Sequence, residues 1–221
     1  MAEKVQIGNA ELWHGDCREV LPLLRGVDAI VSDPPYGIAL RNGDVDGHRS
    51  ARSFEIAGDD TQDVGIAVLQ WAEARQCPTV LFASPWKPWP GEWRNLIVWN
   101  KGGAVGGGGD IKTCAKRTWE LVQVARNGAM HGPRAESVWH FPIVPADTAD
   151  HICAKPVRLM ERLVRTFTTG AVCDPCMGSG STGVAAARLG RRFVGVEIDR
   201  RYFDIACERI ENEQRQFRIA V

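Results

Sequence analysis

Two short motifs in this 221-residue chain carry side chains that could act on a nucleoside. The first is Asp-Pro-Pro-Tyr, which follows an apolar run that ends at Ser32. Asp33 offers a carboxylate and Tyr36 a flat ring. Pro34 and Pro35 have no N–H groups, which leaves the Pro34 carbonyl free to accept a hydrogen bond. Such a clamp would hold a planar group that carries an NH₂, for example the exocyclic amine of a base turned out of its helix. A proline-rich turn without a ligand is the alternative.

The second motif is a glycine-rich turn within residues 171–199. Gly178 and Gly180 would let the backbone approach a ligand closely. Ser181 and Thr182 could cap the helix that follows, whose free N–H groups favour an anion. Glu197 comes 17 residues after Gly180, at the end of the next expected strand, where a carboxylate suits two ribose hydroxyls. The glycine spacing also matches a dinucleotide-binding turn, and a tight turn without a ligand is a further alternative.

The elements around these motifs alternate as in an α/β protein. The first forty residues read strand, helix, strand, which is a parallel βαβ unit, and the pattern returns after residue 151. Ligands of such sheets bind at the carboxyl ends of the strands, where both motifs would lie. We expect strands at 10–14, 27–32, 79–84, 96–100, 118–125, 137–141, 170–174 and 192–197, and helices at 18–24, 64–75, 157–167, 181–189 and 202–216.

Two segments lack any regular pattern. Residues 38–60 are polar and aperiodic, which predicts a mobile loop that could contact a substrate. Residues 102–110 hold six glycines in nine positions and cannot pack as a regular element. The length fits a single domain over 1–221, with an α/β sheet flanked by helices.

Composition excludes several classes of protein. The chain has 27 Lys+Arg and 27 Asp+Glu, so its formal net charge is zero, which argues against nucleic-acid binding by bulk charge alone. No apolar stretch approaches the roughly 20 residues of a membrane span, and we expect no secretory signal. The seven cysteines include Cys173 and Cys176 at C-x-x-C spacing, without further ligands at a spacing that suits zinc. We therefore expect buried thiols in a reducing cytoplasm and no metal site.

The two motifs together resemble those of the S-adenosylmethionine-dependent DNA amino-methyltransferases. The catalytic motif precedes the cofactor motif here, which is the circularly permuted order of the β group of that family. The resemblance covers roughly the first forty and the last seventy residues. It extends to His-Gly-Asp at 14–16, Val-Trp-Asn-Lys at 98–101, His-x-x-x-Lys-Pro at 151–156 and Phe-Val-Gly-Val-Glu-Ile-Asp at 193–199.

This resemblance implies a Rossmann-like methyltransferase fold and a role for each matching residue. The catalytic residues would be Asp33, Pro34, Pro35 and Tyr36. The methionine part of the cofactor would lie in the glycine turn, the ribose at Glu197 and the adenine near Asp16, with Lys155 helping to close the pocket. The implied cofactor-binding residues are Asp16, Cys17, Asp33, Lys155, Asp174, Met177, Gly178, Ser179, Gly180, Ser181, Thr182, Glu197 and Ile198. Cys176, where the family commonly has a bulky residue, and Ile152, where it often has proline, depart from the pattern.

The implied reaction is direct attack of the base amine on the methyl group of the sulfonium. Hydrogen bonds from the amine to Asp33 and to the Pro34 carbonyl would aim its lone pair at that methyl group. The site would supply orientation and preorganised electrostatics, with no covalent enzyme intermediate. An Asp at the first position of the tetrapeptide favours adenine N6 over cytosine N4 in this family.

The middle of the chain, about 85–150, would be the variable region that holds a short target-recognition element. Residues 85–134 carry eight basic and three acidic residues, interleaved with five tryptophans, which suits phosphate contact and base stacking, although each tryptophan taken singly could be core. We expect double-stranded DNA as the partner. A homodimer would enlarge this short region, and a restriction endonuclease could be a second partner. The expected substrate-binding residues are Arg41, Lys101, Lys112, Lys116 and Arg117.

Three other functions fit part of the pattern. A nicotinamide-dependent oxidoreductase would explain the glycine turn and Glu197 but would leave Asp-Pro-Pro-Tyr unused. A non-catalytic nucleic-acid-binding module would leave the intact motifs without a purpose. An RNA or protein substrate is the third alternative, and labelled-methyl transfer to DNA separates it from the main interpretation.

Overall fold

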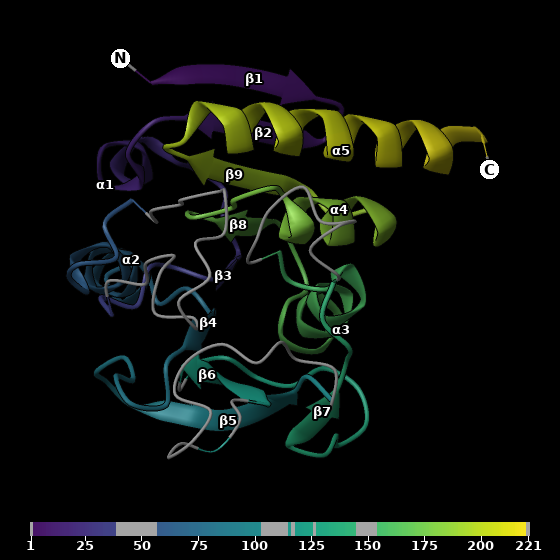
Figure 1. Cartoon of the computed structure of the whole chain (residues 1–221). Helices are drawn as coiled ribbons and strands as arrows, with labels where there is room; N and C mark the ends of the chain where they lie inside the picture. Colours follow the sequence, from purple (N-terminus) through teal and green to yellow (C-terminus); the bar gives the residue numbers. More distant parts are fainter. Residues whose placement is uncertain are drawn as a thin grey trace, which may run out of the picture.

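The computed structural model describes residues 2–38, 57–102, 115, 118–125, 127–144 and 154–219, with the side chains of 217–219 left out. Its strands form one nine-stranded sheet in the order β1-β2-β9-β8-β3-β4-β6-β5-β7 (Figure 1). The strands are β1 Glu3–Ile7, β2 Ala10–His14, β3 Ala29–Ser32, β4 Thr79–Ala83, β5 Trp93–Asn100, β6 Trp119–Ala125, β7 Val138–His140, β8 Val172–Asp174 and β9 Phe193–Glu197.

The centre of the sheet is parallel, as predicted. Strands β2, β9, β8, β3 and β4 run in one direction, whereas β1 and β6 are antiparallel to their neighbours. The expected βαβ unit is present, but its strands β2 and β3 are not adjacent, because β8 and β9 from the end of the chain lie between them. This insertion places the carboxyl ends of early and late strands side by side.

Helices cover both faces of the sheet. Figure 1 shows α1 (Cys17–Val20) and α2 (Asp63–Glu73) on one side, and α3 (Val157–Phe167), α4 (Ser181–Arg188) and α5 (Arg200–Ile219) on the other. Because side chains alternate along a strand, Ile30 packs towards the first group while its neighbour Val31 packs towards the second. Covered on both faces, β3 and β4 are buried along their whole length, which explains their unbroken apolar sequence.

Most predicted elements are confirmed within a few residues, and three differ for physical reasons. The predicted helix at 18–24 is the short α1 followed by a 3₁₀ turn, Leu21–Leu23, because Pro22 has no N–H to continue an α-helix. Helix α5 begins at Arg200, earlier than predicted, because the Asp199 carboxylate accepts bonds from the N–H groups of Arg201 (2.8 Å) and Tyr202 (3.2 Å). Strand β1 was not predicted; it is a largely exposed edge strand without a strong apolar pattern.

The expected irregular segments fall mostly outside the described residues, namely 39–56 and 103–114. The end of the first is placed, because the Asp59 carboxylate accepts a bond from the Gly37 N–H at 2.9 Å. The turn after Asp-Pro-Pro-Tyr is therefore fixed to residues 57–60. Within the described residues, no helix is long and apolar enough to cross a membrane.

Two glycines that flank α4 separate the energetic cost of backbone strain from that of steric overlap. Gly180 (φ +81°) and Gly190 (φ +64°) both have left-handed backbone conformations. A Cβ on Gly180 would lie 2.9 Å from the Ala206 Cβ, whereas a Cβ on Gly190 would meet nothing within 4 Å. Gly190→Ala should therefore lower the free energy of unfolding by about 1 kcal/mol. Gly180→Ala should lower it by about 1–3 kcal/mol more, because the core is overpacked as well. Urea unfolding measures both, and equal losses would contradict the packing described here.

Candidate active site

A hydrogen bond between two adjacent strands joins the two motifs. Asp33 follows β3, Asp174 ends β8, and these strands are paired. The Ser32 hydroxyl donates to Oδ1 of Asp174 at 2.6 Å, across 142 positions of sequence. The carboxyl edge of the sheet therefore brings the Asp-Pro-Pro-Tyr motif next to the glycine turn, as predicted for a doubly wound sheet.

Asp174 holds the glycine turn in place. Its Oδ2 accepts a bond from the Thr182 hydroxyl at 2.5 Å, and its Oδ1 accepts one from the Cys176 N–H at 3.1 Å. The carboxyl group is buried, and burial raises its pKa to about 6, even though its hydrogen bonds act in the opposite direction. Asp174 and Thr182, both predicted to bind a cofactor, thus tie β3, β8 and α4 together.

The expected capping of α4 by Ser181 and Thr182 is wrong. The N-cap residue is Gly180, and no side chain caps the helix, because both hydroxyl residues already lie inside its first turn. Thr182 bonds to Asp174 instead. The buried Ser181 hydroxyl has no hydrogen-bond partner among the described residues, so it can still bond to a ligand at the helix N-terminus.

Two further contacts, one made by Ser179 and one by Met177, hold the middle of the glycine turn. Arg209 of α5 donates from Nη1 to the Ser179 carbonyl (2.6 Å) and hydroxyl (2.8 Å). The side chain of Met177, predicted to bind the cofactor, is buried and occupies the space that a Cβ on Gly195 would need. Sequence reasoning missed Arg209, because nothing distinguishes it from the other charged residues of α5.

The predicted ribose and adenine residues lie together where β2 and β9 end. The Gly15 N–H donates to the Glu197 carbonyl at 2.9 Å, which places Asp16 beside the end of β9. The Glu197 carboxylate accepts from the N–H groups of Gly178 and Asp199, both at 2.8 Å, and burial raises its pKa. Asp16 caps α1 and pairs with Arg18, which lowers the pKa of Asp16. Ile198 is half exposed beside Glu197.

Cysteine thiols lie between these two parts of the site. Cys176 packs against the cluster of buried residues that includes Cys17. The neighbouring Cys17 thiol, together with burial, raises the pKa of Cys176 well above its usual value, so it stays a neutral thiol. At this position the glycine turn is therefore bordered by a small, weakly polar side chain.

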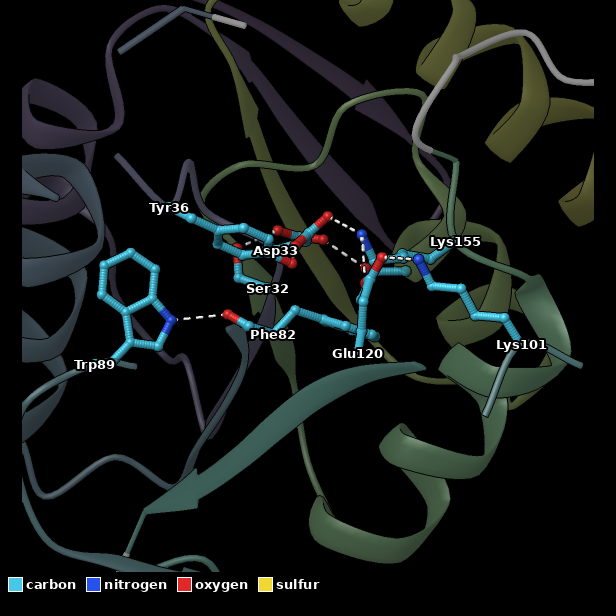
Figure 2. A network of polar contacts seen from close by, with 10 residues as sticks. Ser32, Asp33, Tyr36, Phe82, Trp89, Lys101, Glu120 and Lys155 are labelled. Atoms are coloured by element: carbon cyan, nitrogen blue, oxygen red, sulfur yellow. Dashed lines mark hydrogen bonds and ion pairs between the residues drawn. The ribbon is translucent and has the colours of Figure 1, made fainter. Parts of the chain in front are cut away.

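The Asp33 carboxylate is engaged on both oxygens. Oδ1 accepts a bond from the Tyr36 hydroxyl at 2.5 Å, and Oδ2 accepts one from the Lys155 ammonium (Figure 2). The Tyr36 ring meets the Trp89 ring edge-on, with the centroids 6.4 Å apart. Burial and the charge of Glu120 raise the pKa of Asp33, against the lowering effect of Lys155. Lys155, predicted to close the cofactor pocket, thus contacts the predicted catalytic acid.

Some tryptophans of the variable region are buried in the core, and others are exposed. Trp89 and Trp99 are buried and Trp93 is half-buried, whereas Trp86 is 70% and Trp119 40% exposed, so Trp86 and Trp119 are the most accessible to a base. Lys87 donates to the Gly37 carbonyl at 2.6 Å, which holds the turn at Trp86 beside the Asp-Pro-Pro-Tyr motif. Lys101 forms an ion pair with Glu120, a residue that sequence reasoning missed. The other expected substrate-binding residues, Arg41, Lys112, Lys116 and Arg117, lie outside the described residues.

The raised pKa of Asp174 predicts a stability change with pH. A carboxyl group whose pKa rises on folding stabilises the fold while protonated, and this contribution falls as the pH rises through the folded-state pKa of about 6. The free energy of unfolding of the wild type, measured relative to Asp174→Asn, should therefore decrease between pH 4 and about pH 7. Urea unfolding of both proteins across this range measures the difference, and an increase with pH would contradict the burial of this carboxylate.

Comparisons with known proteins relate this chain to DNA methyltransferases. A family model of N6/N4 methylases, described as DNA methylase, matches residues 112–208. The type II methyltransferase M2.DpnII of Streptococcus pneumoniae is 45% identical over 87 residues, which are 37% of this chain and 32% of that protein. The type II methyltransferase M.ScaI of Streptomyces caespitosus is 26% identical over 91% of this chain and 81% of its own length.

Two solved structures share the fold. The complex of M1.HpyAVI with S-adenosylmethionine has a TM-score of 0.64 at 21% identity, covering 91% of this chain and 98% of that one. The cytosine-N4-specific PvuII DNA methyltransferase has a TM-score of 0.67 at 13% identity, covering 96% and 93%. The fold is therefore that of the DNA methyltransferases. The family match and the relatives, taken with the two joined motifs, support a DNA amino-methyltransferase.

Proposed function

We propose that this chain transfers a methyl group from S-adenosylmethionine to the exocyclic amine of a base flipped out of double-stranded DNA. The observation that carries the proposal is the bond between Ser32 and Asp174, because it sets the amine-binding motif against the glycine turn. A dinucleotide enzyme would need the turn but would give Asp33 and Tyr36 no role.

The glycine turn fits the cofactor. The buried Ser181 hydroxyl, without a partner among the described residues, and the N-terminus of α4 suit the carboxylate of a methionine moiety. Glu197 would accept hydrogen bonds from the ribose hydroxyls through the lone pairs that its two backbone bonds leave free. Ile198 and Asp16 would border the adenine, with Ile198 offering an apolar surface. The bound cofactor supplies an electrophilic methyl group.

Asp33 and Pro34 would orient the amine. The Asp33 carboxylate and the Pro34 carbonyl accept one N–H each, which turns the nitrogen lone pair towards the methyl group. As the N–C bond forms, the S–C bond breaks and the nitrogen becomes positively charged. The raised pKa of Asp33 suits it to take the proton that the nitrogen then loses.

The favoured base is adenine, methylated at N6. The aspartate at the first position of the tetrapeptide supports this choice. Cytosine N4 is the second candidate, because the fold is shared with a cytosine-N4-specific enzyme. The exposed rings of Trp86 and Trp119 are the described side chains best placed to stack on DNA.

Replacing the amine-binding carboxylate tests the proposed role of Asp33. Asp33→Asn should lower methyl transfer from tritiated cofactor to unmethylated DNA by roughly 100-fold or more, because it removes an interaction made to the reacting nitrogen. Calorimetry should show little change in affinity for S-adenosylmethionine. Asp60→Asn, a change of the same kind at an exposed position, is the control. Full activity of Asp33→Asn would contradict the assignment.

The modified base identifies the reaction. After incubation with cofactor and unmethylated DNA, nucleoside digestion and mass spectrometry should show N6-methyladenine. N4-methylcytosine would favour the second candidate instead. If methyl groups appear only in RNA or protein, or nowhere, the proposal is wrong.

A further inference from the structure

Four charged side chains converge beside the amine-binding motif (Figure 2). Asp33 follows β3, Lys155 precedes α3, Glu120 lies near the start of β6, and Lys101 follows β5. Glu120 pairs with Trp99, and the next residue of β6 pairs with the last residue of β4. This register brings Glu120 to the same carboxyl edge as Asp33, although the two residues are 87 positions apart.

Lys155 lies between two carboxylates. Its Nζ bonds to Oδ2 of Asp33 and stands 3.4 Å from Oε2 of Glu120. The ring of Phe82 lies alongside it, with the centroid 4.9 Å from Nζ. The side chain of Lys155 is only 10% exposed, so its ammonium group depends on these partners rather than on water.

The two oxygens of Glu120 differ. Oε1 forms an ion pair with Lys101. Oε2 is buried and has no hydrogen-bond partner within the described part of the chain, although it faces Lys155. A buried carboxylate oxygen without such a bond is costly, and it is ready to accept one.

Binding of a substrate amine changes what Asp33 must do. Its oxygens accept bonds from Tyr36 and Lys155, and the lysine charge beside Oδ2 opposes the positive charge that develops on the amine nitrogen, so the amine is bound best once Lys155 has left Asp33. A buried ammonium that lost Asp33 with no replacement would be strongly destabilised. Oε2 of Glu120 offers that replacement within a short movement of the lysine side chain.

We propose that Lys155 moves from Asp33 to Glu120 when the amine enters, so that Glu120, held by Lys101, is a positioning residue for methyl transfer. This inference rests on the proposed function for its catalytic consequence. The exchange keeps the buried charges paired while it frees the Asp33 carboxylate for the amine. The charges of Lys155 and Lys101 lower the pKa of Glu120 against the effect of burial, so Glu120 stays ionised and able to receive the lysine.

The exchange can be tested in the free protein, without substrate. The probe is the ¹⁵N resonance of the Lys155 ammonium, assigned by its loss in Lys155→Arg. In Asp33→Asn and in Glu120→Gln the protected ammonium signal should remain, because one carboxylate still holds it, and in the double variant it should disappear. Loss of the signal in Asp33→Asn alone would show that Glu120 does not receive the lysine. Its survival in the double variant would show that neither carboxylate is needed. Either result overturns the proposal.

The catalytic consequence is tested by turnover. Glu120→Gln should lower the turnover rate roughly 10- to 100-fold, because Lys155 stays on Asp33 and the amine is misplaced. Affinity for S-adenosylmethionine should change little, and turnover is compared at a temperature at which the variant remains folded. Glu161→Gln, which removes a partly exposed ion pair with Arg188, is the matched control and should keep full activity. Wild-type turnover in Glu120→Gln would overturn the proposal.

The pH profile separates positioning from mere support of the fold. Asp33 is faced by Tyr36, Lys155 and Glu120, and its charge acts on Asp174. Of these, Glu120 raises the pKa of Asp33, so Glu120→Gln should move the acid limb of the turnover profile to lower pH. An unmoved limb would contradict the role of Glu120. If the wild type methylates no DNA, the proposed function fails, whereas the resonance experiment still decides whether the lysine exchanges.

Discussion

The hydrogen bond from Ser32 to Asp174 is the contact on which the site depends. It joins the end of β3 to the end of β8, and so joins a motif near the start of the chain to one near its end. The bond can form because β8 and β9 insert between β2 and β3. The Asp174 carboxylate in turn fixes the glycine turn by accepting hydrogen bonds from the Thr182 hydroxyl and the Cys176 N–H. The proposed amine clamp and the proposed cofactor turn are thereby joined at one edge of the sheet.

The carboxyl edge of the sheet also buries several carboxylate groups. Asp33, Asp174 and Glu197 all have raised pKa values, because each carboxylate is removed from water. The protein offsets that cost with hydroxyl groups, backbone N–H groups and the Lys155 ammonium. Apart from Lys155, which we propose to move, these groups are in place before a substrate arrives, and oriented methyl transfer requires such preorganisation.

Local sequence predicted every strand except β1, most helices and both motifs, because apolar periodicity, glycine turns and proline positions act over short distances. It predicted which residues form the glycine turn, but not which groups their side chains bond to. The Ser181 and Thr182 capping was wrong, since Asp174 competes for the Thr182 hydroxyl. Glu120 and Arg209 were missed because their partners lie far away in sequence. Such contacts depend on strand order and register, which no local pattern encodes.

The most direct test of this account is a crystal structure of the chain with S-adenosylmethionine bound. The account predicts the methionine carboxylate at the Ser181 hydroxyl and the N-terminus of α4, the ribose at Glu197, and the sulfonium methyl group facing the Asp33 carboxylate. A cofactor bound elsewhere, or one whose methyl group points away from Asp33, would contradict it.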